Sequence, residues 1–199
     1  LSSLSSGVFS FYAPKLYAQY CHALLRVFER DHSLQRNFED SIFPATSFNS
    51  VSVDHTDVSN VGYGLCALAS IGSFDSHKGG HLILFDMGLM LEFPPGSVAL
   101  LPSGILRHGN TTIQDGEERY SIAQYCAGGL VRWVKYGHQT AVTIRKDNSK
   151  LKAKDILDTL NGDHAERVDE ALGLFSKVDE LDSDRRSAYK DFATFLRTD

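Results

Sequence analysis

The sequence has few cysteines, no long apolar run and no excess of positive charge. Its three cysteines lie far apart and form no CxxC pair, which excludes a disulfide framework and argues against a zinc site. No apolar run approaches the roughly 18 residues of a membrane span, so no membrane partner is expected. The net charge of −5 is opposite to that of a general nucleic-acid binder. We therefore expect an intracellular protein whose thiols are reduced and buried.

Length and composition are those of an ordinary globular domain. The 199 residues are 42% hydrophobic and 23% charged, which allows one domain, with or without a helical appendage, to bury a core without disulfides. The chain opens at Leu1 without an initiator methionine, so we expect a piece of a longer protein. We expect this piece to be a monomer.

Three zones of the sequence differ in their patterns. Residues 1–45 repeat apolar side chains at helical spacing, which predicts a helical segment that packs on the sheet. Residues 46–138 alternate short apolar runs with turn sequences, which predicts strands. Residues 139–199 are rich in charge and carry an amphipathic stripe, which predicts two or three surface helices. The fold class is therefore predicted as α+β, with a mainly β core and flanking N- and C-terminal helices.

The central zone contains seven predicted strands. They lie at residues 49–53, 64–70, 81–85, 90–93, 98–101, 120–125 and 131–135. Strands at this spacing are typical of a sandwich or a jelly-roll barrel. Strands and helices do not alternate along the chain, which argues against a doubly wound nucleotide-binding fold.

A candidate metal site begins with His55-Thr56-Asp57, after the first predicted strand. An HxD triplet alone is a weak signal, because such triplets arise by chance. His108 follows Asp57 by 51 residues, with several predicted strands in between. Two histidines and one carboxylate can occupy one face of an octahedral ferrous ion and leave three positions open for a 2-oxoacid and dioxygen. We therefore predict that His55, Asp57 and His108 form an iron site and the catalytic centre.

A second group follows this metal site along the chain. Arg119 lies 11 residues after His108, and Ser121 lies two residues further. Side chains two apart on a strand point to the same face. A guanidinium and a hydroxyl directed into a barrel match the distal carboxylate of a five-carbon diacid. The alternative is that Arg119 forms a surface ion pair with Glu117 or Glu118.

Three segments carry a resemblance to a known family. They are HTDVSNVGYG, FDSHKGGHLILFDMGLMLEFPPGSVALLPSGILRHGN and GEERYSIAQYCAGGLVRWVKYG. These segments resemble the Fe(II)- and 2-oxoglutarate-dependent dioxygenases, and within them the TET/JBP-like family as found in mushroom-forming fungi. The resemblance covers residues 47–138, and it implies the double-stranded β-helix, or jelly-roll, fold.

The resemblance also implies roles for single residues. His55, Asp57 and His108 match the Fe(II) ligands of the family. Arg119 and Ser121 match the residues that hold the distal carboxylate of 2-oxoglutarate. The cofactors implied are therefore Fe(II) and 2-oxoglutarate.

The substrate implied by the resemblance is a methylated nucleobase. We expect oxidation of 5-methylcytosine, or of N6-methyladenine, in DNA rather than in RNA, and hence a nuclear location. In TET-like enzymes the residue three positions after the metal-binding aspartate contacts the flipped base; that residue is Asn60 here, and an amide can both donate and accept. Tyr63 is a second candidate for substrate contact, because its ring could stack on a base. The alternatives are that Asn60 is a turn residue and that Tyr63 belongs to the core.

Two other functions stay open. The excess of acidic over basic residues favours a second possibility, in which the same chemistry acts on a protein side chain or a small molecule. A catalytically inactive binding module is the other alternative, but the presence of all three metal ligands together with Arg119 and Ser121 argues against it.

Overall fold

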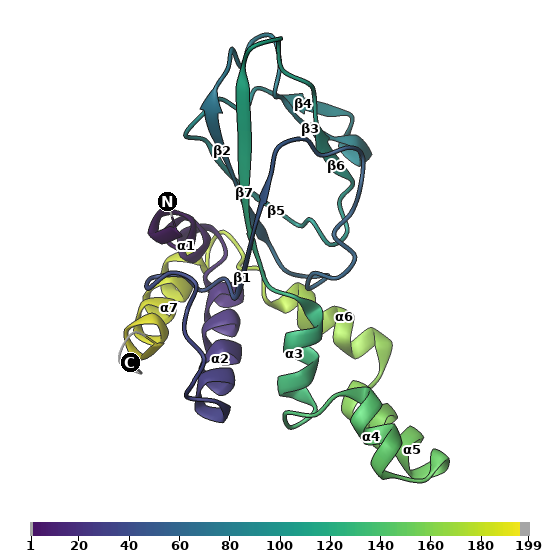
Figure 1. Cartoon of the computed structure of the whole chain (residues 1–199). Helices are drawn as coiled ribbons and strands as arrows, with labels where there is room; N and C mark the ends of the chain where they lie inside the picture. The colour runs from purple at the N-terminus through teal and green to yellow at the C-terminus, as the bar shows by residue number, and fades with distance from the viewer. Residues whose placement is uncertain (1, 196–199) are drawn as a thin grey trace. The chain divides into compact units, whose positions relative to one another are not determined.

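A computed structural model describes residues 2–195 of the chain (Figure 1). It confirms an α+β protein with antiparallel sheets and flanking helices. The chain forms two compact units, and both are discontinuous in sequence. The first contains the residues up to Phe9 together with Arg36–Ala127, and the second contains Ser10–Gln35 together with the chain from Gly128 onward. Within residues 2–195, no helix has both the length and the apolar character that crossing a bilayer requires.

The first unit contains two antiparallel sheets. Its strands are β1 (Ala45–Asn49), β2 (Cys66–Ser73), β3 (Leu82–Leu84), β4 (Leu89–Leu91), β5 (Val98–Leu101), β6 (His108–Asn110) and β7 (Glu118–Tyr125), and a 3-10 turn, η1 (Phe85–Met87), joins β3 to β4. The larger sheet has the order β1-β7-β2-β5, and the smaller sheet has the order β4-β3-β6. The first and last strands of the unit are therefore neighbours.

The register of the larger sheet determines which side chains share a face. In the β2–β7 pair, Ser121 lies opposite Ser70 and Arg119 lies opposite Gly72. Side chains alternate between the two faces along a strand, so Arg119 and Ser121 share one face of β7. Gly72 has a φ of +128°, and a Cβ there would lie 2.2 Å from the carbonyl oxygen of Glu118. Only glycine fits opposite Arg119 without moving the backbone.

An apolar core joins the two sheets. Leu82 and Leu84 of the smaller sheet pack with Leu101 of the larger sheet and with Phe93, and all four are buried. Leu68 of β2 packs against the same cluster. Helix α1 (Ser2–Tyr12) adds a second contact within this unit, because the ring of its Phe9 stacks on Phe43 at a centroid distance of 5.6 Å.

The second unit is helical. It contains α2 (Pro14–Arg30), α3 (Gly128–Lys135), α4 (Ala141–Asp147), α5 (Lys150–Asn161), α6 (His164–Gly173) and α7 (Leu181–Phe195). Helix α2 buries Tyr17, Tyr20 and Leu24 from its predicted apolar face, and it packs against α7. The end of the predicted C-terminal extension, residues 196–199, lies outside the described residues. The division into 1–45, 46–138 and 139–199, with the N-terminal segment on the barrel, stays a prediction.

Parts of the secondary structure differ from the sequence-based expectation, and residues 139–195 contain four helices where two or three were predicted. The strand predicted at 131–135 is wrong, because this segment belongs to helix α3. Its valines and tryptophan favour strands by propensity, but Val131 and Val134 are three apart and both half-buried, which fits a helix face. The three-residue strand β6 was not predicted. The strand predicted at 49–53 is misplaced, because the observed strand is Ala45–Asn49 and residues 50–53 form no strand.

Replacing Leu82 by alanine tests the core between the sheets. Leu82 is 2% exposed, so Leu82→Ala should lower the free energy of unfolding by about 2–5 kcal/mol. Its cross-strand partner Leu91 on β4 is 42% exposed and serves as a matched control, with an expected loss below about 1 kcal/mol. Urea unfolding followed by circular dichroism measures both. Equal losses would show that the two sheets do not share this core.

Candidate functional site

The backbone brings two histidines of the first unit together. His55 donates its N–H to the carbonyl oxygen of His108 at 3.1 Å, and His108 donates to the carbonyl of His55 at 2.9 Å. The two imidazoles therefore lie beside each other, with ring centroids 4.4 Å apart. Gly109 makes this approach possible, because a Cβ there would lie 2.9 Å from the carbonyl oxygen of Ser52.

Both imidazoles are oriented by hydrogen bonds from their Nδ1 atoms. Nδ1 of His55 lies 2.7 Å from the carbonyl oxygen of Val53, and Nδ1 of His108 lies 2.9 Å from that of Leu106. A carbonyl oxygen only accepts, so each Nδ1 carries the proton and each Nε2 presents a lone pair. This is the arrangement that metal-binding histidines usually have.

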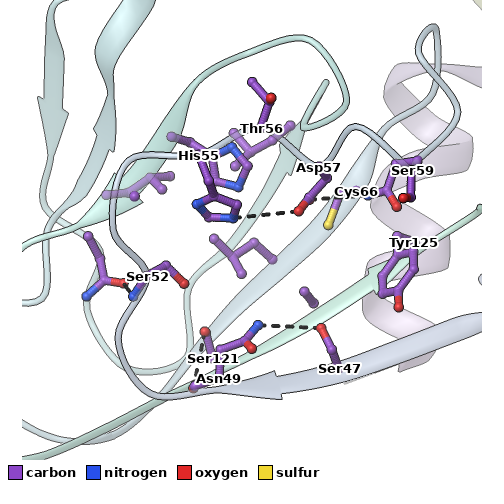
Figure 2. Close-up of a pocket in the computed structure, with 18 of the residues that line it drawn as sticks. Ser47, Asn49, Ser52, His55, Thr56, Asp57, Ser59, Cys66, Ser121 and Tyr125 are labelled. Atoms are coloured by element: carbon purple, nitrogen blue, oxygen red, sulfur yellow. Dashed lines mark hydrogen bonds and ion pairs between the residues drawn. The ribbon is translucent and has the colours of Figure 1, made fainter.

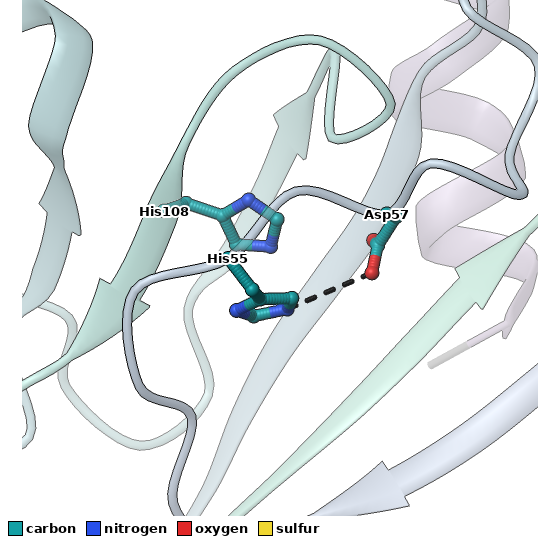
Figure 3. A group of neighbouring side chains, drawn as sticks. All are labelled: His55, Asp57 and His108. Atoms are coloured by element: carbon teal, nitrogen blue, oxygen red, sulfur yellow. Dashed lines mark ion pairs between the residues drawn. The ribbon is translucent and has the colours of Figure 1, made fainter.

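Asp57 completes a three-residue cluster (Figure 3). Its backbone N–H donates to the carbonyl of Ser103 at 2.8 Å, and its Oδ1 lies 3.6 Å from Nε2 of His55. One ligand atom from each of His55, Asp57 and His108 lies within 4.8 Å of the others, so the group could hold a metal ion. The fold thus brings together the three residues that the sequence spacing indicated.

Asn60 orients the carboxylate of this cluster. Its Nδ2 donates to Oδ2 of Asp57 at 3.2 Å and to Oγ of Ser103 at 3.1 Å. Its backbone N–H donates to the carbonyl of Asp57 at 2.8 Å. Sequence reasoning did not assign this positioning role to Asn60, although a spacing of three residues is that of a tight turn. Ser103, which is 2% exposed, was missed altogether.

A cavity of about 420 Å³ is lined by His55, Asp57 and His108, the candidate metal ligands, which we call the metal-ligand cluster. His55 and Asp57 lie on one side of it, and Ser47, Asn49 and Ser121 from the larger sheet lie on the other (Figure 2). Other predicted and unpredicted residues line the same space, among them Asn60, Cys66, His108, Arg119 and Tyr125. The predicted metal ligands and the predicted diacid-binding pair therefore share one cavity.

Arg119 is a buried cation in the cavity wall. Its residue is 5% exposed, its Nη1 donates to the carbonyl of Ser50 at 3.2 Å, and its buried Nε has no hydrogen-bond partner among the described residues. Burial lowers the pKa of its guanidinium. Among the described residues, Arg119 forms no ion pair with Glu117 or Glu118, and the carboxylate of Glu117 accepts instead from the N–H groups of Asp75 and Gln114. A buried guanidinium of this kind is complementary to an anion.

Of the other predicted site residues, Ser121 lines the cavity and Tyr63 does not. Ser121 is 3% exposed, lines the cavity and donates from Oγ to the carbonyl of Asn49 at 3.4 Å. Tyr63 lies in the turn after Val61, is half-buried and is not part of the cavity lining. Tyr125 does line the cavity, and only its even spacing from Arg119 and Ser121 on β7 could have indicated this.

Cys66 also lines the cavity, but its thiol is inert. Burial, and secondarily the charge of Asp57, raise the pKa of the Cys66 thiol to about 12. The side chain is therefore a protonated thiol at neutral pH, which argues against a nucleophilic role.

Comparisons with known proteins include a weak structural similarity. No protein-family model matches the chain, and no curated protein matches it. Among solved structures, the fold is similar to that of NgTET1 in complex with 5mC DNA, with a TM-score of 0.40 and 21% sequence identity. The matched region covers 52% of this chain and 42% of that chain, so the chain matches less than half of that protein's length. A similarity at this level assigns neither activity nor ligand.

Proposed function

We propose that the chain is an Fe(II)- and 2-oxoglutarate-dependent dioxygenase that oxidises a methyl group on a nucleobase, with 5-methylcytosine in DNA as the first candidate and N6-methyladenine as the second. The observation that carries the proposal is the cavity, which combines a cluster of two histidines and one carboxylate with the buried Arg119. A metal at the cluster and a cation in the wall suit a ligand with two acidic ends. We also propose that the two antiparallel sheets form a double-stranded β-helix.

Each cavity residue has a task in this proposal. Nε2 of His55, Nε2 of His108 and the carboxylate of Asp57 would hold Fe(II). Arg119 and Ser121 would hold the distal carboxylate of 2-oxoglutarate, with charge-assisted hydrogen bonds from the guanidinium. When both are bound, iron and 2-oxoglutarate supply the oxidation of a C–H bond by dioxygen. Three leucines also line the cavity and would limit the access of water to the reacting groups, namely Leu68, Leu82 and Leu101.

The choice of a nucleobase rests on the family resemblance and on the position of Asn60. Asn60 lines the cavity beside the metal cluster, and its Oδ1 could accept a hydrogen bond from a base edge while its Nδ2 holds Asp57. A base in a duplex must leave the stack to reach such a site. Stacking by Tyr63 stays a prediction, and Tyr125 is the aromatic residue that lines the cavity. We also propose a nuclear location, which a DNA substrate would require, and a monomeric state.

The same chemistry on a protein side chain or a small molecule is the second candidate, and one observation favours it. The first unit contains four Lys and Arg residues against ten Asp and Glu residues. Of its cations, Arg107 is paired with Asp54 and Lys78 is paired with Asp75. The unit that contains the cavity therefore offers little free positive charge to the phosphates of a nucleic acid.

Metal titration tests the cluster. Asp57→Ala should abolish binding of Co(II), used as a spectroscopic stand-in for Fe(II), because it removes a ligand. Asn60→Ala should weaken binding about 10- to 100-fold, because the carboxylate loses the hydrogen bond that orients it. His81→Ala is the control, since His81 contacts Thr111 and lies outside the cluster. Unchanged Co(II) spectra in the Asp57 variant would rule out this metal site.

Substitution of Arg119 tests the diacid site. Arg119→Ala should weaken 2-oxoglutarate binding by about 10- to 100-fold, which corresponds to the loss of one or two charge-assisted hydrogen bonds. Arg119→Lys should fall between this variant and the parent, since it keeps the charge and loses the fork. Calorimetric titration measures the affinities, and thermal unfolding verifies the fold. If saturating 2-oxoglutarate restored no turnover to Arg119→Ala, the assigned role would be wrong.

A product assay tests the reaction. The parent, with Fe(II) and 2-oxoglutarate, should add oxygen to oligonucleotides that carry 5-methylcytosine or N6-methyladenine and should release succinate in equal amount. Mass spectrometry of the digested oligonucleotide and of succinate measures both products, with Asp57→Ala as the inactive control. Methylated peptides offered in parallel decide between the two candidates. Succinate without any oxidised base would favour the second candidate, and no succinate with any substrate would indicate an inactive binding module.

A further inference from the structure

If the proposed function is correct, the phosphates of the nucleic acid must be bound outside the acidic first unit. Five Lys and Arg residues gather at one end of the helix pair α4–α5 in the second unit. This α4–α5 basic corner consists of Arg145, Lys146, Lys150, Lys152 and Lys154. All five are exposed. Figure 1 shows the two helices side by side, joined by a short connection at this corner.

The side chains of the basic corner have no partners among the side chains that the structure describes, residues 3–190. None of the five forms an ion pair or a side-chain hydrogen bond there. Some cations elsewhere in the same unit are paired, as Lys15 is with Glu180 and Arg185 is with Asp182. Residues 145–155 contain five cations and two carboxylates, a net charge of +3, in a chain whose net charge is −5.

The first turn of α5 adds to this positive charge. Lys150 and Lys152 lie in that turn, which contains no acidic residue. The N-terminal end of a helix is itself positive, so cations there lower helix stability and anions raise it. Only the hydroxyl of Ser149, which accepts from the N–H of Lys152, caps the free N–H groups. The N-terminal turn of α5 therefore favours a bound anion. Without an anion, Lys150 and Lys152 lower the stability of the helix.

A hydrophobic core holds together the two helices that carry the basic corner. Ile144 of α4 packs with Ala153 and Leu157 of α5 and with Tyr136, and all four are buried. The hydroxyl of Tyr136 also donates to Oδ1 of Asn161 at the other end of α5 at 2.7 Å. Because the backbone beneath the five cations is held by this core, little ordering of the chain opposes binding.

We propose that the α4–α5 basic corner binds the sugar-phosphate backbone of nucleic acid and supplies the affinity that the acidic first unit lacks. This surface contacts phosphates and carries no sequence preference. Leu151, which is 83% exposed between Lys150 and Lys152, offers an apolar contact to the sugars.

The test compares two triple variants of the full chain. Lys150→Gln, Lys152→Gln and Lys154→Gln together remove three cations of the corner and preserve helix propensity. Arg26→Gln, Arg30→Gln and Arg186→Gln together remove three exposed cations of α2 and α7 in the same unit and give the same net charge. Fluorescence anisotropy with a short labelled DNA duplex, over a series of NaCl concentrations and without iron or 2-oxoglutarate, measures binding. Circular dichroism verifies the helices.

The corner variant should lose at least tenfold in affinity, and its slope of log K against log salt should fall by about three. The loss should be equal for methylated and unmethylated duplexes, and the control variant should bind like the parent. Equal losses in both variants, or none in either, would overturn the proposal. Capture of the parent by phosphatidylserine vesicles without binding to DNA would also overturn it, in favour of a lipid surface.

The basic corner and the proposed function can be refuted independently of each other. A parent that oxidises methylated DNA, with a corner variant that still binds DNA normally, would refute the corner and leave the function standing. A parent that binds DNA through the corner and oxidises no base would refute the function and leave the corner standing.

Discussion

The metal-ligand cluster depends on one short backbone pairing, the reciprocal hydrogen bonds between His55 and His108. This pairing joins the loop after β1 to the first residue of β6, and it continues to Asn110, whose N–H donates to the carbonyl of Ser52. The same loop supplies the Val53 carbonyl that orients the ring of His55. Backbone geometry, rather than side-chain packing alone, therefore positions both imidazoles, and Gly109 is the residue that permits the close approach.

The larger sheet arranges the rest of the cavity through the alternation of its strands. Arg119 and Ser121 face the cavity because they are two apart on β7, and Asn49 lies opposite Ser121 on β1. The cavity thus has a metal-ligand side built from loops and β6 and a polar side built from regular strands. A loop can bring ligands close together, and a strand can space two groups at a fixed interval, so the two sides suit their proposed tasks.

Much of the secondary structure could be predicted from the sequence, because short apolar runs between turn sequences mark strands such as β2 and β5. The three-residue strand β6 is too short to show a period, and α3 contains strand-favouring residues that tertiary packing turns into a helix. The two interleaved units could not be predicted, since the packing of α2 on α7 joins segments far apart in sequence. The ligand triplet could be proposed from spacing. The hydrogen bonds of Asn60 to Asp57 and Ser103, and the buried Nε of Arg119 without a partner among the described residues, depend on coordinates.

The burial of Arg119 links folding to ligand supply. A guanidinium taken out of water without a counter-charge destabilises the empty protein. An anion that binds it adds its own binding free energy to the stability of the fold, in proportion to the logarithm of its concentration. In a cell that degrades unfolded chains, the abundance of this protein would then rise with the concentration of the anion that pairs with Arg119. If Arg119 holds the distal carboxylate as proposed, the concentration of that acid would influence how much of the folded protein persists.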